Sequence, residues 1–429
     1  MLKICLSIMF LLCVPFIAEI KYDYETAKKV LLENNREILL SSQTVKDAEG
    51  KLTDAESGYF PKISLLGNYN YLSSVPVIQM PAPINRAVQF GANENWLFKA
   101  TLTQTIFDWG RMFDSPSMFG KNLELAKLDL EQVKTQNIYN LNQVFYSVIL
   151  AKKVVETNEE SLRVSEENMK MAENRLKAGA GSSFDSLRAK VRVSSVRPLV
   201  EKSRNSYEAA LNSLKNLLGV PLIEKVEITG DFVEAINLEI DNSAALKKAF
   251  EQRFEIKKSD KRKEMLVSAL AVSVSMDKPL ITGNLSYNYQ NPYYSQISWV
   301  ESWNAGVTLT IPLFDGFSTA GKIKQAEAAV ASADVAKSAV LSQVEFEVRQ
   351  AVLNLNETNE RIKSQKENVR QAEEYLRIAQ SSYTSGVITN YDVMDAHLSL
   401  LTAKTAYLQA LYDLTVAKAA FLKAIGELK

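Results

Sequence analysis

The fold is decided by a stretch without glycine or proline, which occupies residues 322–385 and reads KIKQAEAAVASADVAKSAVLSQVEFEVRQAVLNLNETNERIKSQKENVRQAEEYLRIAQSSYTS. Apolar and small residues recur along it at alternating spacings of three and four, from Leu341 to Tyr383. This seam is typical of a helix that packs in a coiled coil. At 1.5 Å per residue, a helix of about 60 residues would be roughly 100 Å long. Residues 121–178 have the same character, so the sequence predicts two very long helices.

Each long helix runs into a short turn that contains glycine, at 178–183 and at 385–390. Glycine suits the left-handed position that follows a helix. Ser183 and Asn390 are expected to cap helices that return along the long ones. We therefore expect two helical hairpins. Their tips carry Gly179, Ala180, Gly386 and Val387.

The chain matches itself at an offset of 207 residues from Trp96 onward, and at an offset of 218 residues from Glu33 to Tyr71. One offset holds through predicted strands, helices and turns, which chance does not explain. The pairs include Trp96 with Trp303, Gly179 with Gly386, Asp185 with Asp392, Pro61 with Pro279 and Tyr69 with Tyr287. The sequence therefore predicts two internal structural repeats, each with a helix, two strands, a very long helix and a return helix.

These repeats define the expected domain organisation. An export signal should occupy residues 1–18. The first repeat, 19–240, should contain a helix at 24–57, strands at about 62–72 and 96–107, a long helix at about 112–178, a return helix at about 184–219 and an irregular equatorial linker at 220–242. The second repeat, 241–429, should contain a helix at 243–275, strands at about 280–290 and 303–313, a long helix at about 317–385 and a return helix at about 390–426.

The first residues have the pattern of an export signal. Lys3 precedes an apolar run from Ile4 to Val14, and Ala18 is a plausible cleavage position. A short anchor helix is the alternative. Both cysteines lie in this segment, so we expect no disulfide in the mature chain. No later run approaches 18 consecutive apolar residues, so any membrane span would have to be a β-strand.

The predicted strands alternate between apolar and polar residues, most cleanly over 281–289. Their lengths of about 9 to 11 residues suit tilted transmembrane strands. A half-buried soluble sheet gives the same alternation, but export and the long helices favour a membrane. Four strands cannot close a barrel, and an open edge in lipid leaves backbone groups unpaired. Several protomers would have to share one barrel, and the strand count alone fits a dimer or a trimer.

Composition excludes several function classes. Lys and Arg number 50 and Asp and Glu number 50, which does not favour nucleic acid as a partner. One histidine, His397, and two cysteines leave little material for a transition-metal site or a nucleophile pair. We therefore expect no cofactor, no metal and no enzymatic activity, and we assign His397 no role.

Four motifs resemble the TolC family of outer-membrane efflux and secretion channels. They read GYFP at 58–61, TQTIFDWGR at 103–111, TIPLFDGF at 310–317 and SYTSGVITNYDVMDA at 382–396. The resemblance implies an α+β membrane protein of the outer membrane. It implies a homotrimer in which a shared twelve-stranded transmembrane β-barrel, four strands per protomer, continues into a periplasmic α-helical coiled-coil barrel. It also implies docking onto a periplasmic adaptor (a membrane fusion protein) and an inner-membrane transporter.

The resemblance also implies site residues. The aspartates of the family's DVxD motif, here Asp392 and Asp395, would line a closed aperture, and Asp185 is the matching position of the first repeat. The best-known members of the family carry an arginine two residues after the tip glycine, which pairs with the aspartate that matches Asp185, but this chain has Ile388 at that position. Arg188 occupies the position that matches Asp395 and would provide a different closure.

Two other functions stay open at this point: a periplasmic coiled-coil adaptor and a structural envelope protein. The adaptor should lack four strands of membrane length and two full internal repeats, and a structural coiled coil does not explain the strands.

Overall fold

The computed structural model describes residues 20–89, 91–232, 241–293 and 297–428. The predicted export signal and part of the predicted linker lie outside these residues. The chain divides into two compact units. The first contains residues 1–41, 130–254 and 341–429, and the second contains residues 42–129 and 255–340.

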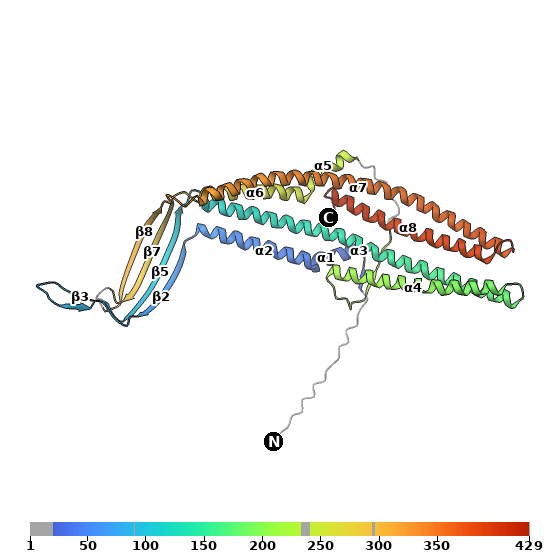
Figure 1. The fold of residues 1–429 in the computed structure, drawn as a ribbon, viewed down its shortest axis with the longest axis horizontal. Helices are drawn as coiled ribbons and strands as arrows, with labels where there is room; N and C mark the ends of the chain where they lie inside the picture. The colour runs from blue at the N-terminus through green and yellow to red at the C-terminus, as the bar shows by residue number, and fades with distance from the viewer. Residues whose placement is uncertain (1–19, 90, 233–240, 294–296, 429) are drawn as a thin grey trace, which may run out of the picture. The chain divides into compact units, whose positions relative to one another are not determined.

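The second unit contains a four-stranded antiparallel sheet, in which the strands lie side by side in the order β2, β5, β7, β8 (Figure 1). The strands are β2 (Lys62–Tyr71), β5 (Glu94–Phe107), β7 (Leu280–Asn291) and β8 (Val300–Thr310). The strand predicted to reach residue 313 ends at Thr310, because Pro312 has no N–H with which to extend the ladder. Strands β2 and β8 form the two edges of this sheet. A small hairpin of β3 (Val77–Gln79) and β4 (Ala87–Gln89) lies between β2 and β5 in the chain.

Two helices of 67 residues dominate the molecule, α3 (Arg111–Lys177) and α7 (Ser318–Thr384). Each is followed by a return helix, α4 (Ser183–Leu218) or α8 (Asn390–Ala424) (Figure 1). Much of the predicted seam of α7 is buried, including Val344, Val348, Leu355 and Ile362. No helix in the described part of the chain is both long and apolar enough to cross a membrane.

Helix α3 is tied to α4 by ion pairs across the first hairpin, such as Arg204 with Glu159 at 2.6 Å and Lys190 with Glu173 at 3.0 Å. Helix α8 packs on α7 through small residues, as in the cluster of Ala379, Val393 and Ala396. Small side chains let the backbones of α7 and α8 approach closely. In each hairpin of the first unit, the return helix therefore packs directly on the long helix.

The predictions of single helices at 24–57 and 243–275 are wrong. The first segment forms α1 (Tyr24–Asn34), α2 (Arg36–Glu56) and a 3-10 turn, η1 (Ser57–Tyr59). The second forms α5 (Asn242–Gln252) and α6 (Phe254–Val274). The breaks fall at Asn35 and Arg253, which match at the 218-residue offset. Both residues have extended backbone, and the Asn35 side chain accepts the N–H groups of Glu37 and Ile38, which starts a new helix.

Part of the linker predicted to be irregular is also a strand. In the first unit β1 (Ile20–Tyr22) pairs in parallel with β6 (Val226–Ile228). The pairing brings the start of the described chain against the segment that joins the predicted repeats. A three-residue ladder of this kind carries too little periodic pattern to be recognised from sequence.

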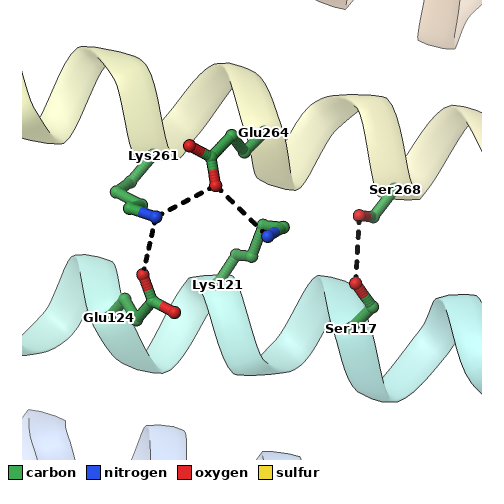
Figure 2. Close-up of polar contacts among 6 residues, drawn as sticks. All are labelled: Ser117, Lys121, Glu124, Lys261, Glu264 and Ser268. Carbon is green, nitrogen blue, oxygen red and sulfur yellow. Dashed lines mark hydrogen bonds and ion pairs between the residues drawn. The ribbon is translucent and has the colours of Figure 1, made fainter.

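Charged residues couple α6 to α3 within the second unit (Figure 2). Lys261 contacts Glu124 at 3.0 Å, and Glu264 contacts Lys121 at 3.2 Å. Lys261 and Glu264 also contact each other at 3.0 Å, so the four residues form one network. Farther along α6, the Ser268 and Ser117 hydroxyls lie 3.4 Å apart. Each ion pair is partly exposed and contributes roughly 0.2–1 kcal/mol, but a network holds the two helices in one register.

Candidate functional site

The register of the sheet gathers apolar side chains on one face. Leu65 pairs with Ala100, Ala100 with Tyr287, and Tyr287 with Trp303. Directly opposed residues in adjacent strands point to the same side, so this row crosses all four strands on one face. A parallel row, on the same face, consists of Ile63, Leu102, Leu285 and Ala305.

The other face is polar. One row that crosses the four strands consists of Ser64, Thr101, Ser286 and Asn304. On the apolar face, Leu65 is 78% exposed and Val307 is 70% exposed. A soluble sheet of this pattern would bury its apolar face against another layer. Here that face is open in the single chain, which is what contact with lipid or with another protein requires.

Aromatic side chains lie at both ends of the strands. At the end of β2 and the start of β5, Tyr69 and Trp96 lie 4.4 Å apart between ring centroids. Beyond the other end of β5, Phe107 and Trp109 lie 5.4 Å apart. Aromatic residues at both ends of an apolar band are typical of membrane-spanning sheets, where the rings sit at the lipid–water interfaces. Trp303 lies within β8 on the apolar face, opposite Tyr287.

The two hairpin tips, defined as residues 178–182 and 385–389, have matching geometry. Gly179 has φ of 70° and Gly386 has φ of 76°, the left-handed conformation expected for both. A Cβ atom at either glycine would meet nothing within 4 Å. Ala180 and Val387 follow them, and both are exposed. The tips therefore present small residues and accessible backbone.

The predicted caps are displaced by one residue. Ser182, not Ser183, caps α4, since its hydroxyl oxygen accepts the N–H groups of Phe184 and Asp185. Thr389, not Asn390, is the N-cap of α8. The pattern of Ser or Thr followed three residues later by an acidic residue occurs at both places and could have identified these caps.

Asp392 belongs to this cap. Its carboxylate accepts the Thr389 backbone N–H at 2.8 Å and the Thr389 hydroxyl at 2.7 Å. The hydrogen bond from the Thr389 side chain, followed by that from its backbone, holds the pKa of Asp392 below its usual range. Asp392 is therefore ionised at neutral pH and fixed in orientation within one protomer.

Ile388 stands where the TolC family places an arginine. It packs against Val393 and the small residues around it. A contact between the residue before the N-cap and the fourth helical residue is a hydrophobic staple, which fixes the angle at which the chain enters the helix. In this chain the side chain at position 388 therefore packs among apolar residues and cannot form an ion pair.

Arg188 contacts aromatic rings. Its guanidinium carbon lies 4.2 Å from the ring centroid of Phe184, also on α4, and 5.3 Å from that of Tyr391 on α8. Among the residues that the structure describes, it forms no ion pair with Asp185, Asp392 or Asp395. Sequence reasoning missed Phe184 and Tyr391, although they occupy matching positions in the repeats. The single chain thus brings Arg188 to the first turn of α8 through stacking.

No group of three or more His, Cys, Asp or Glu residues able to hold a metal ion occurs in the described ranges. The three aspartates predicted to line the aperture, Asp185 of α4 and Asp392 and Asp395 of α8, lie on two separate helices, and the carboxylate of Asp392 is held by Thr389. Asp395 is exposed on α8. Any joint action of these carboxylates would have to come from assembly with other copies.

Comparison with known proteins identifies the relatives of this architecture. A family model described as "Outer membrane efflux protein" matches residues 29–220 and 245–427. "Outer membrane protein TolC" of Vibrio cholerae is 24% identical over 404 residues, which cover 91% of this chain and 87% of that protein. "Alkaline protease secretion protein AprF" of Pseudomonas aeruginosa is 22% identical over 342 residues, covering 75% and 67%.

Among solved structures, the CmeC outer membrane channel of Campylobacter jejuni matches with a TM-score of 0.81 and 17% identity. The match covers 94% of this chain and 85% of that one. At this identity the match concerns the fold alone. Together with the family match, it confirms the resemblance to TolC-type channels that the sequence motifs indicated.

Proposed function

Because this chain belongs to the outer membrane efflux protein family, we propose that it is the outer-membrane exit duct of an efflux pump or secretion system. In this role it conducts substrates passively from an inner-membrane transporter across the periplasm and the outer membrane, and performs no catalytic step. The observation that supports this proposal most strongly is the sheet. Its register places apolar residues on one uncovered face and polar residues on the other.

Three copies would share one barrel. The strands β2, β5, β7 and β8 alternate in direction, so the β8 edge of one copy can pair antiparallel with the β2 edge of the next. A head-to-tail contact of this kind closes into a ring, which removes every unpaired edge from the lipid. Twelve strands would put the apolar face toward lipid and the polar face toward a water-filled lumen. The helical hairpins of the three copies would form the periplasmic tube, with each copy supplying two structural repeats.

Cysteine crosslinking tests the shared barrel. Cysteine at Leu66 on β2 would be combined with cysteine at Ser302, Asn304 or Gly306 on β8, all on the polar face. Within one chain these strands are three strand spacings apart, about 14 Å, which is too far for a disulfide. We expect chains linked into dimers and trimers on denaturing gels of outer membranes. The matched controls place the β8 cysteine at Trp303 or Ala305, on the opposite face, and should not crosslink.

The aperture would form where three copies bring Asp392 and Asp395 together around an axis. Six carboxylates in one narrow passage attract cations and repel anions. Assembly would oppose the effect of the Thr389 cap on the pKa of Asp392, because like charges nearby disfavour an ionised carboxylate. With Ile388 in place of the family arginine, closure relies on packing of the first turns. Arg188 contributes through its contacts with Phe184 and Tyr391, and Asp185 adds a carboxylate from the first repeat.

The tips would dock a periplasmic adaptor. Gly179 and Gly386 leave open space around their backbones, and Ala180 and Val387 are exposed beside them. An apolar stripe on α4, formed by Phe184, Leu187 and Val191, begins directly after the first tip and is exposed in the single chain. Cysteines at Ala180 and Val387 should crosslink to a co-purifying periplasmic adaptor. Crosslinks obtained only from cysteines in segment 220–232 would contradict docking at the tips.

A further inference from the structure

The only histidine of the chain lies in a polar cavity between three helices of the first unit. His397 on α8 is 8% exposed, and neither ring nitrogen forms a hydrogen bond of normal geometry, although the Ser161 backbone lies near enough to favour the protonated ring. The cavity has a volume of about 10 Å³, room for about one water molecule. Its lining residues are Ser165 and Asn168 of α3, Ala189 and Arg192 of α4, and Met394 and His397 of α8.

Two further polar atoms of this region lack partners. The Nη2 atom of Arg192 and the hydroxyl of Ser161 are both buried without a hydrogen bond. Buried polar groups without partners are uncommon, and a site with several of them usually holds water. One water could accept from Arg192 and donate to a neutral imidazole nitrogen of His397. That arrangement needs an unprotonated ring, since an imidazolium has two donors and no acceptor.

Charged residues on α3, α4 and α8 lie near the imidazole ring of His397. Arg192 of α4 and Lys404 of α8 disfavour a second positive charge, whereas Glu160 of α3 favours it. Glu160 is already paired with Arg163 at 2.6 Å, and Lys404 with Glu373 of α7 at 3.3 Å. Burial, followed by the charge of Arg192, holds the pKa of His397 below its usual value, while Ser161 and Glu160 act in the opposite direction.

We propose that His397 is a proton-binding switch, whose protonation replaces a water-mediated contact with repulsion from Arg192 and loosens the packing of α8 on α3 and α4. The neutral ring, and with it the contact, is lost as the pH falls through the folded-state pKa of His397. The stability that the neutral ring contributes is fully present above the unfolded-state pKa of about 6.5 and decreases as the pH falls from that value to the folded-state pKa. The switch lies next to the first turns of α4 and α8, so acidification would relax the segment that carries Asp392 and Arg188. The inference concerns packing within one protomer and does not rest on the proposed duct.

The single histidine makes the test direct. The full-length protein, purified with a tag that contains no histidine, would be labelled with 15N-histidine, so that its ring signals report one residue. Amide hydrogen exchange would be measured across the same titration for residues 185–200 of α4 and 390–405 of α8. The rates would be expressed as protection factors relative to the unfolded chain. We expect a titration midpoint below 6.5, and a loss of protection that begins as the pH falls below about 6.5 and is complete below that midpoint. Each pH unit by which the His397 midpoint lies below 6.5 corresponds to about a tenfold loss of protection.

Two variants complete the test. His397→Gln retains a polar side chain that cannot be charged, and its protection should not depend on pH. His397→Gln with Leu398→His moves the histidine to an exposed neighbouring position, where the midpoint should return to about 6.5 without a change in protection. A midpoint for His397 at or above that of the moved histidine would overturn the proposal. So would the same pH-dependent loss of protection in His397→Gln.

Discussion

The side-chain amide of Asn35 donates a hydrogen bond to the backbone carbonyl of Leu217 at 2.8 Å. This bond ties the break between α1 and α2 to the last turn of α4. The second repeat has the same relationship with a different residue, since Arg253 donates from Nη1 to the Ala424 carbonyl at 3.4 Å and pairs with Glu347 at 2.8 Å. Asn35 matches Arg253 at the 218-residue offset, and Leu217 matches Ala424 at the 207-residue offset. Both helix breaks therefore anchor the end of a return helix.

Asn35→Ala should weaken this anchor by about 1–3 kcal/mol, because it leaves a carbonyl unpaired and removes a helix cap. Asn35→Asp keeps the cap acceptor, but its carboxylate cannot donate and would face the Leu217 carbonyl at a buried position, so it should weaken the anchor at least as much. Amide hydrogen exchange in the last turn of α4 and the first turn of α2 measures the effect of each variant. Equal exchange in wild type and Asn35→Ala would show that the bond contributes nothing.

Gly219→Ala should disrupt the same region more severely. Gly219 has φ of 72°, and a Cβ atom there would lie 2.4 Å from the Asn34 carbonyl oxygen. The left-handed conformation alone costs a non-glycine residue roughly 1–2 kcal/mol, and the clash adds to it. Gly50→Ala is the matched control, since Gly50 lies within α2 with nothing within 4 Å of its Cβ position. It should raise stability by about 0.5–1 kcal/mol. The amount of folded protein recovered from outer membranes would be measured for Gly219→Ala and for Gly50→Ala. Equal amounts would contradict the prediction.

The network of Figure 2 should depend on pH and salt. Hydrogen bonds from Lys261, followed by Lys121, hold the pKa of Glu264 below its usual value. A depressed folded-state pKa contributes stability that is present above the unfolded value of about 4.3 and is lost as the pH falls through the folded value. Glu264→Gln should remove that dependence, with a loss of roughly 0.2–1 kcal/mol at neutral pH.

Charge reversal gives a sharper test of the same network. Lys261→Glu places a third carboxylate beside Glu124 and Glu264 and should increase exchange in α6. Addition of Glu124→Lys should restore part of the protection. If the double variant is no better protected than the single one, the pair does not couple α3 to α6.

The aperture carboxylates should govern ion selectivity. Asp392→Asn with Asp395→Asn removes both charges but leaves an acceptor for Thr389, so the cap of α8 is retained. In planar bilayers we expect lower cation selectivity and weaker block by divalent ions. The difference should be larger at low salt, where screening is weaker. Unchanged selectivity and unchanged block would remove these residues from the aperture.

Arg188→Ala should raise single-channel conductance, because it removes the stacking that joins the first turn of α4 to Tyr391. Arg188→Lys is the control, since it keeps the charge but lacks the planar group. An increase in both variants points to stacking rather than charge. No increase in either would exclude Arg188 from closure.

The long helices and the turns that end them could be predicted from the sequence. The seam of residues 341–383 and the glycines at 179 and 386 predict the helices and turns, because periodicity and left-handed backbone are local requirements. The breaks at Asn35 and Arg253 could not be predicted, because the partners that stabilise them lie about 180 residues away. The cavity around His397 depends on three helices at once. A single histidine in a helix gives no periodic pattern from which such a cavity could be predicted.

If three chains share one channel in the outer membrane, the mass of the intact particle shows it most directly. Protein extracted from outer membranes with detergent would be measured by native mass spectrometry after release from the micelle. We predict a single species that contains three chains. A stable monomer, recovered with the soluble periplasmic proteins, would contradict both the shared sheet and the membrane location.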